Sequence, residues 1–174
     1  MYFNRLVEKE IELKLKTSGA IVVAGPKFCG KTTTCMRYQK SFVKLNTKQT
    51  IAMARMNPKA MLSGEKPRLI DEWQEVPEFW DAIRFTVDHK DGDGLFILTG
   101  SAVPVVSDKI HHTGTGRYGW VTMRPMSLWE SEESNGEIMI SKLFENPENI
   151  CGYNSINLEQ LAFLICRGGW PKSL

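Results

Sequence analysis

Apolar positions along the chain form short continuous runs that are separated by stretches of helical spacing. The runs at residues 20–24 and 95–98 are typical of buried strands. Residues 50–54 and 118–123 predict two further strands, and Leu69-Ile70 predicts a short one. Together these runs predict five strands, distributed over most of the chain.

Helical spacing of apolar residues predicts amphipathic helices around these strands. The N-terminal helix places Phe3, Leu6 and Ile11 on one face. Acids and bases alternate between them, which favours a solvated helix over a nucleic-acid surface. Three helices are predicted by range, at residues 2–16, 33–40 and 158–166. Three more are predicted from their first residues: a short helix capped by Asn57 before Pro58, a helix that begins at Val76-Pro77-Glu78, and a helix that begins with Ser127 as its cap and Glu130 three residues later.

The most specific motif of the chain lies between the first strand and the helix at 33–40. Gly25-Pro26-Lys27-Phe28-Cys29-Gly30-Lys31-Thr32 fits the phosphate-binding loop pattern Gly-x-x-x-x-Gly-Lys-Thr. Its glycines let backbone N–H groups turn toward phosphate oxygens, and the positive end of the helix faces the same anion. We therefore predict that Gly25 to Thr33 bind a nucleotide, with Lys31 reaching the β- and γ-phosphates and the Thr32 hydroxyl binding Mg²⁺. The alternative is a glycine-rich turn without a ligand.

Asp71 and Glu72 form an acidic pair directly after Leu69-Ile70. Two adjacent carboxylates alone usually mark a solvated surface. Their position after a strand and downstream of a phosphate loop instead resembles Walker B, the second nucleotide motif of P-loop ATPases. Asp71 would then hold the Mg²⁺ shell, while Glu72 would act in catalysis by taking or orienting the proton of the attacking water.

Thr99 and Ser101 follow the apolar run at 95–98. A polar residue at the end of such a strand can orient the attacking water, as the sensor residue does in AAA-type ATPases. Both residues are candidates, and their spacing does not choose between them. The alternative is that the two hydroxyls only cap the end of the strand.

Arg117 ends a polar, glycine-rich loop at residues 111–117. A guanidinium on such a loop suits the neutralisation of a transferring phosphate. We predict that Arg117 acts on the γ-phosphate, either in its own chain or in a neighbouring one. A surface arginine or a structural ion pair is an equally good interpretation of the sequence.

Composition places few limits on function. The chain has 174 residues and a formal net charge of +2, so binding to DNA is possible but not evident from charge. No apolar run is long enough to span a membrane, and the N-terminus lacks the apolar core of a signal peptide. The four cysteines lack the paired spacing of a metal site, which favours free thiols in a reducing compartment. We therefore expect a cytoplasmic protein with no membrane partner.

Taken together, the motifs resemble the prokaryotic AAA-type ATPases that are usually joined to a C-terminal nuclease-like domain. The resemblance is carried by GPKFCGKTTT, RLIDEWQEVPEFWDAIR, FILTGSA, HTGTGRYGWVTMRPMSLWES and RGGWP. It implies an α/β fold: a three-layer P-loop NTPase with a central, mainly parallel sheet flanked by helices. It also implies that the 95–98 strand lies between the phosphate-loop strand and the Asp-Glu strand.

The resemblance further implies a division of the chain into an ATPase core at 1–150 and the beginning of a helical lid at 151–174. Gly169 and Pro171 would begin the lid element near the adenine. Similar proteins continue beyond this point, so we expect a missing C-terminal domain, or self-association through the apolar helix at 158–166. Trp73 and Gln74 belong to the family pattern, but the residues alone assign neither a chemical role.

These observations predict Mg²⁺-dependent binding and hydrolysis of ATP. The absence of a guanine-reading Asn-Lys-x-Asp segment favours ATP over GTP. One alternative is a nucleotide-dependent switch or DNA-associated regulatory module with little turnover. A small-molecule kinase is a weaker alternative, because a kinase needs several arginines in a mobile lid and only Arg117 and Arg124 lie in the relevant region.

Overall fold

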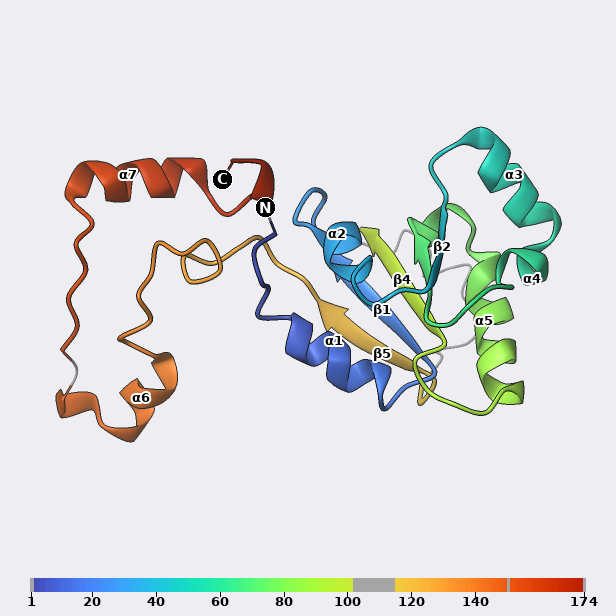
Figure 1. Ribbon diagram of the computed structural model, residues 1–174, viewed down its shortest axis with the longest axis horizontal. Coiled ribbons are helices and arrows are strands. Elements are labelled where there is room, and N and C mark those ends of the chain that lie inside the picture. The colour runs from blue at the N-terminus through green and yellow to red at the C-terminus, as the bar shows by residue number, and fades with distance from the viewer. Residues whose placement is uncertain (1, 102–114, 150, 174) are drawn as a thin grey trace. The chain divides into compact units, whose positions relative to one another are not determined.

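A five-stranded parallel sheet forms the centre of the first of two compact units in the chain (Figure 1). The structure is a computed structural model, and it describes residues 2–101, 115–149 and 151–173. The first unit is Leu6–Arg124, and the second combines Met1–Arg5 with Pro125–Leu174. The compact units thus divide between Arg124 and Pro125, while the functional division at residue 150 stays a prediction.

The strand order of the sheet is β2-β3-β4-β1-β5, and every neighbouring pair is parallel. The predicted insertion of β4 between the phosphate-loop strand β1 and the acidic strand β3 is therefore confirmed. Because the strands are parallel, their carboxyl ends lie at one edge of the sheet. The strands are β1 (Ala20–Gly25), β2 (Ser41–Lys44), β3 (Arg68–Asp71), β4 (Phe96–Ser101) and β5 (Tyr118–Thr122).

Helices cover both faces of this sheet, which gives the predicted three layers. Successive residues of β1 point to opposite faces, so Val22 belongs to one buried apolar cluster and Ile21 to the other. The first cluster packs under α3 (Lys48–Met56), α4 (Pro58–Met61) and α5 (Glu78–His89). The second cluster packs under α1 (Glu8–Leu15) and α2 (Lys31–Cys35), with Ile11 and Cys35 fully buried.

The strand predicted at residues 50–54 is wrong, because this segment lies in helix α3. The Thr47 side chain caps the helix by accepting a hydrogen bond from the backbone N–H of Thr50 at 3.1 Å. Alanine, methionine, glutamine and arginine dominate the segment, and all four are good helix formers. The second strand lies earlier, at Ser41–Lys44, where Val43 is its buried residue.

Two predicted helices are shorter in the structure than in the sequence pattern. The helix predicted at residues 2–16 is α1, which begins at Glu8. The helix predicted at 33–40 is α2, which ends at Cys35 after three consecutive threonines, a poor helix-forming residue. By contrast, α4 begins as predicted, since the Asn57 side chain accepts from the backbone N–H of Ala60 at 3.0 Å.

The second unit contains α6 (Ile140–Glu145) and α7 (Leu158–Arg167), the latter confirming the helix predicted at 158–166. The Ser127–Glu130 cap forms as predicted, with the Ser127 backbone N–H donating to Glu130 at 2.7 Å. No helix follows it, because the turn ends at Glu132, which has φ 65°. No helix in the described part of the chain has both the length and the apolar character of a membrane span.

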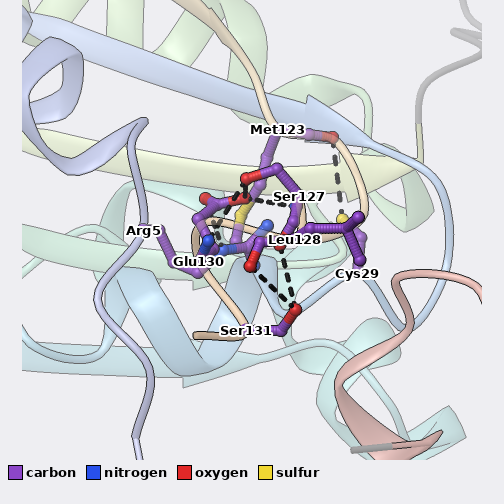
Figure 2. A network of polar contacts seen from close by, with 7 residues as sticks. All are labelled: Arg5, Cys29, Met123, Ser127, Leu128, Glu130 and Ser131. Carbon is purple, nitrogen blue, oxygen red and sulfur yellow. Dashed lines mark hydrogen bonds and ion pairs between the residues drawn. The ribbon is translucent and has the colours of Figure 1, made fainter. Parts of the chain in front are cut away.

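A buried ion pair ties the N-terminal residues of this unit to its remainder. The guanidinium of Arg5 donates through Nε to Glu130 at 2.9 Å (Figure 2). Both side chains are almost entirely buried, at 4% and 7% exposure. Glu130 therefore has two functions, since it caps the turn at Ser127 and also neutralises Arg5.

Candidate functional site

The phosphate loop connects β1 to α2 and wraps around the side chain of Lys31. The Lys31 Nζ atom donates hydrogen bonds to the carbonyl oxygens of Gly25, at 2.9 Å, and Pro26, at 2.8 Å. These bonds compensate for the burial of a charged residue that is only 7% exposed. Gly30 caps α2 with φ 101°, a left-handed conformation that favours glycine. The predicted loop thus places positive charge at its own centre.

Close backbone packing determines where the loop begins. A Cβ atom on Gly25 would lie 2.1 Å from the carbonyl oxygen of Met123, so only glycine fits without a backbone shift. The same carbonyl accepts a weak hydrogen bond from Sγ of Cys29 at 3.7 Å (Figure 2). The side chain of Cys29 is fully buried and packs in the core, whereas Lys27 and Phe28 are exposed.

Asp71 connects three elements of the site. It ends β3 and is 3% exposed. Its Oδ1 atom accepts a hydrogen bond from the Thr32 hydroxyl of α2 at 2.7 Å and another from the Thr99 hydroxyl of β4 at 2.6 Å. The structure therefore brings together both predicted metal-binding residues and one predicted sensor. Thr33, the next residue of α2, is exposed.

Glu72 follows Asp71 in the left-handed conformation, with φ 60° and ψ 43°. The chain turns at this residue out of β3 and into the 3-10 helix η1 (Trp73–Glu75). A non-glycine residue in this conformation is uncommon, and such residues cluster at functional sites. The Glu72 carboxylate accepts a hydrogen bond from the side-chain amide of Gln74.

The two predicted sensors both lie at the carboxyl edge of the sheet. Thr99 is in register with Asp71, and Ser101 is in register with Gly25. This is the edge at which open α/β sheets bind their ligands. Thr99 is buried, while Ser101 at the end of β4 is half-buried.

Arg117 lies at the opposite edge of the sheet from the phosphate loop. Its carbonyl oxygen accepts a hydrogen bond from the backbone N–H of Ala20, the first residue of β1, at 3.1 Å. Its Nε atom pairs with Asp88 at 2.7 Å, and this hydrogen bond lowers the pKa of the Asp88 carboxyl below its ordinary value. The structure does not bring Arg117 to the loop of its own chain, and the geometry matches the structural ion pair. Residues 111–114 of the same predicted loop lie outside the described residues.

Gly169 and Pro171 belong to the second unit. The Gly169 carbonyl oxygen accepts a hydrogen bond from the backbone N–H of Met126 at 2.7 Å, and a Cβ at Gly169 would lie 2.1 Å from the Met126 carbonyl oxygen. Gly169 is thus needed for close backbone packing within its unit. Pro171 begins the 3-10 helix η4 (Pro171–Ser173). Contact of either residue with adenine stays a prediction.

Sequence reasoning assigned no role to Gln74 or Gly100, which both lie at the site. Gln74 contacts Glu72, and Gly100 leaves space for Gln74 between two neighbouring strand ends. The feature of the sequence that could have indicated a role for Gln74 is its position only two residues after Glu72. Only the turn at Glu72 shows that the amide folds back onto the carboxylate.

Comparison with known proteins agrees with this geometry. The family described as "AAA domain" matches residues 17–132, which is more than half of the chain. No curated protein matches the sequence. Among solved structures, the chain is similar to the Walker-type ATPase PABY2304 of Pyrococcus abyssi, with a TM-score of 0.51 and 15% identity over 75% of this chain. It also aligns with PCH-2 of C. elegans, at a TM-score of 0.40 and 15% identity, covering 89% of this chain and 47% of that one.

The match to the Pyrococcus protein covers 56% of that chain, so the present chain spans little more than half of its length. At 15% identity this likeness shows the fold, which is the α/β P-loop arrangement of strands and flanking helices. The family match covers the phosphate loop, the acidic pair and both predicted sensors. The chain therefore belongs to the AAA domain family, as a P-loop ATPase-like nucleotide-binding domain.

Proposed function

We propose that this domain binds ATP together with Mg²⁺ and hydrolyses it. The observation that carries the proposal is the 2.7 Å hydrogen bond between Thr32 of the phosphate loop and Asp71 of the acidic strand. A simple glycine-rich turn does not need a hydroxyl and a carboxylate in contact next to a buried lysine. A Mg·nucleotide site needs all three groups together.

Lys31 supports phosphate binding through its charge and its surroundings. Within the described residues, its ammonium is bonded to two neutral carbonyl oxygens and forms no ion pair. A buried cation of this kind gains strongly from an anionic partner. A phosphate group bound in the loop would supply that partner.

The donor atoms of Thr32 and Asp71 suit Mg²⁺, which prefers hard oxygen ligands. Among the described residues, no group of three or more His, Cys, Asp or Glu side chains could hold a metal ion. A magnesium ion usually takes one or two protein ligands and completes its shell with phosphate oxygens and water, so Thr32 and Asp71 could supply its protein ligands. When bound, it would neutralise charge on the phosphates.

Glu72 is the residue that we propose takes or orients the proton of the attacking water. It lies directly after Asp71, and its carboxylate is half-buried at the edge of the sheet where the loop lies. Thr99 donates its hydroxyl proton to Asp71. Ser101 is therefore the sensor candidate whose hydroxyl can donate to water or phosphate.

Binding of nucleotide by a Lys31→Ala variant tests the proposal. We expect calorimetric titration with Mg·ATP to show tight binding by the parent protein and none by Lys31→Ala, with both folded by circular dichroism. Lys9→Ala, which removes an exposed lysine of α1, is the matched control and should bind like the parent. Unchanged affinity in Lys31→Ala would refute the assignment of the loop.

The position of Arg117 favours a second candidate, a nucleotide-dependent switch with slow turnover. The predicted arginine finger lies at the far edge of the sheet in its own chain. An arginine of this kind can contribute roughly 10³–10⁵ in rate, so a chain that lacks one at its site should hydrolyse ATP slowly. Tight binding of ATP with negligible phosphate release would support the switch, and a neighbouring chain could then supply Arg117.

From the family resemblance we also propose a cytoplasmic protein whose residues after 150 begin a lid over the adenine. The same resemblance supports a C-terminal nuclease-like domain in the longer proteins of this kind. A DNA partner and self-association are further proposals. Of these, self-association has support from α7, on which Leu158, Phe163 and Ile165 are 84%, 64% and 72% exposed.

A further inference from the structure

The turn that follows the acidic pair folds a glutamine side chain back onto Glu72. The Nε2 atom of Gln74 donates a hydrogen bond to Oε2 of Glu72. We propose that Gln74 is a positioning residue, which holds the Glu72 carboxylate in the orientation needed to take a proton from the attacking water. This inference rests on the proposed hydrolysis of ATP.

The chemistry of the two groups sets the orientation of the Gln74 amide. An ionised carboxylate can only accept hydrogen bonds, so the NH₂ end of the amide must face Glu72. The other end, Oε1, then points toward Gly100, where a Cβ atom would lie 2.4 Å from it. Oε1 is buried and has no hydrogen-bond partner among the described residues. The Gln74 amide thus keeps its hydrogen bond to Glu72 but leaves its own oxygen buried without a partner. A buried, unpaired oxygen costs free energy, so a purely structural residue would not be expected to adopt this arrangement.

Rigid packing holds Gln74 in this place. Its neighbour Trp73 is buried in the core and packs against Trp80, with ring centroids 5.3 Å apart. The indole nitrogen of Trp73 would lie 3.1 Å from a Cβ at Gly100, so Gly100 makes room for both side chains of the turn. A turn anchored in this way can direct the amide at a single point.

The same turn leaves one side of the Glu72 carboxylate open. The left-handed φ of 60° at Glu72 restrains its backbone, and Gln74 restrains Oε2. Within the described residues, Oε1 of Glu72 has no hydrogen-bond partner, so it can accept a proton. Because Gln74 is neutral, it orients the carboxylate without forming an ion pair that would oppose protonation.

A double-mutant cycle tests the positioning role. Gln74→Met keeps the length of the side chain and removes its donor. We expect kcat to fall about tenfold or more, with KM and ADP affinity unchanged, because the lost interaction acts on the chemical step. In a Glu72→Gln background the same change should have no further effect on kcat, since the group that it positions is already lost. Gln39→Met is the matched control, because Gln39 is also half-buried with an unpaired Oε1 in the described structure, and it should turn over like the parent.

A spectroscopic measurement keeps the test independent of turnover and of the folding of Gln74→Met. In ¹H–¹⁵N spectra, Glu72→Ala should shift the side-chain amide signal of Gln74 and leave that of Gln39 unchanged. An unshifted Gln74 signal, or additive effects in the cycle, would overturn the positioning role. Normal turnover by Gln74→Met beside an inactive Glu72→Gln would overturn it as well, while leaving the proposed function intact. Absence of turnover in the parent, or normal turnover by Glu72→Gln, would overturn the proposed function and this role with it.

Discussion

A single oxygen atom of Asp71 accepts hydrogen bonds from two threonine hydroxyl groups at the site. Thr32 and Thr99 donate to Oδ1 from two different elements, so this one acceptor joins the start of α2 to the end of β4. All three residues are needed in the proposed site, but the hydrogen bonds also hold the loop and the sheet together. We therefore expect Asp71 to contribute to stability in a way that can be separated from its proposed role in metal binding.

Replacing Asp71 tests this separation. Asp71→Ala leaves two hydroxyls without their acceptor, so we expect a loss of about 1–3 kcal/mol in the free energy of unfolding. It should also remove the Mg²⁺-dependent part of ATP affinity. Asp71→Asn keeps an acceptor oxygen but loses the charge, so most of the stability should return while the Mg²⁺ dependence does not. Urea unfolding and calorimetry with Mg²⁺ or EDTA measure the two effects, and equal Mg²⁺ dependence in all three proteins would contradict the metal assignment.

At the scale of elements, the connection between α4 and β3 places a lysine over an aromatic ring at the start of β4. Lys66 Nζ donates to the Leu62 carbonyl oxygen at 2.7 Å and lies 3.6 Å from the ring centroid of Phe96. Partial burial lowers the pKa of Lys66 from 10.5 to about 8. The Lys66 amine thus binds its proton less tightly in the folded protein than in the unfolded chain.

This shift predicts a pH dependence of stability with a definite sign. Between about pH 8 and pH 10.5 the unfolded chain binds the Lys66 proton and the folded protein releases it, so this group's contribution to the free energy of unfolding rises with pH. Lys66→Met cannot titrate and should lack that rise. The difference between parent and variant in urea unfolding, followed from pH 7 to about pH 10, isolates Lys66 from other titrating groups. A constant difference across this range would contradict the prediction.

The sequence predicted the elements of the site better than the elements around it. β1, the loop and β4 were predictable because each of the two apolar runs is flanked by glycine and is rich in β-branched or aromatic residues, which favours a strand over a helix. The segment at 50–54 was not, because a short apolar run fits a strand or a helix equally well. The threonine cap at Thr47 decided between them.

The relation between residues distant in sequence explains the remaining differences. Both Thr32 and Asp71 were assigned to one Mg²⁺ ion from the sequence, so their closeness was expected, but their direct hydrogen bond was not. The position of Arg117 was not expected either, because the residues alone do not show the direction of the 118–123 strand relative to β1. The parallel pairing of β5 with β1 places Arg117, the residue before β5, at the amino edge of the sheet.

On the scale of the whole molecule, this position means that an arginine finger at residue 117 would have to serve a second copy of the chain. We expect Lys31→Ala and Arg117→Ala to be inactive alone and to regain phosphate release when mixed, because each copy can supply what the other lacks. Asp88→Asn removes the ion pair but keeps the arginine, so it should retain activity. Equal losses in Arg117→Ala and Asp88→Asn, without recovery on mixing, would leave Arg117 with a structural role only.

The close approach of Gly25 to Met123 also restricts how the phosphate loop can move. Met123 lies against the phosphate loop through its carbonyl oxygen, and its N–H donates to Ala24 at 2.8 Å. It is also two residues before Pro125, where the second compact unit begins. With no room for even one methyl group between Gly25 and Met123, the loop cannot move toward this segment without displacing it. A shift of the loop toward β5 would therefore have to move Met123, which lies two residues before the boundary at Pro125.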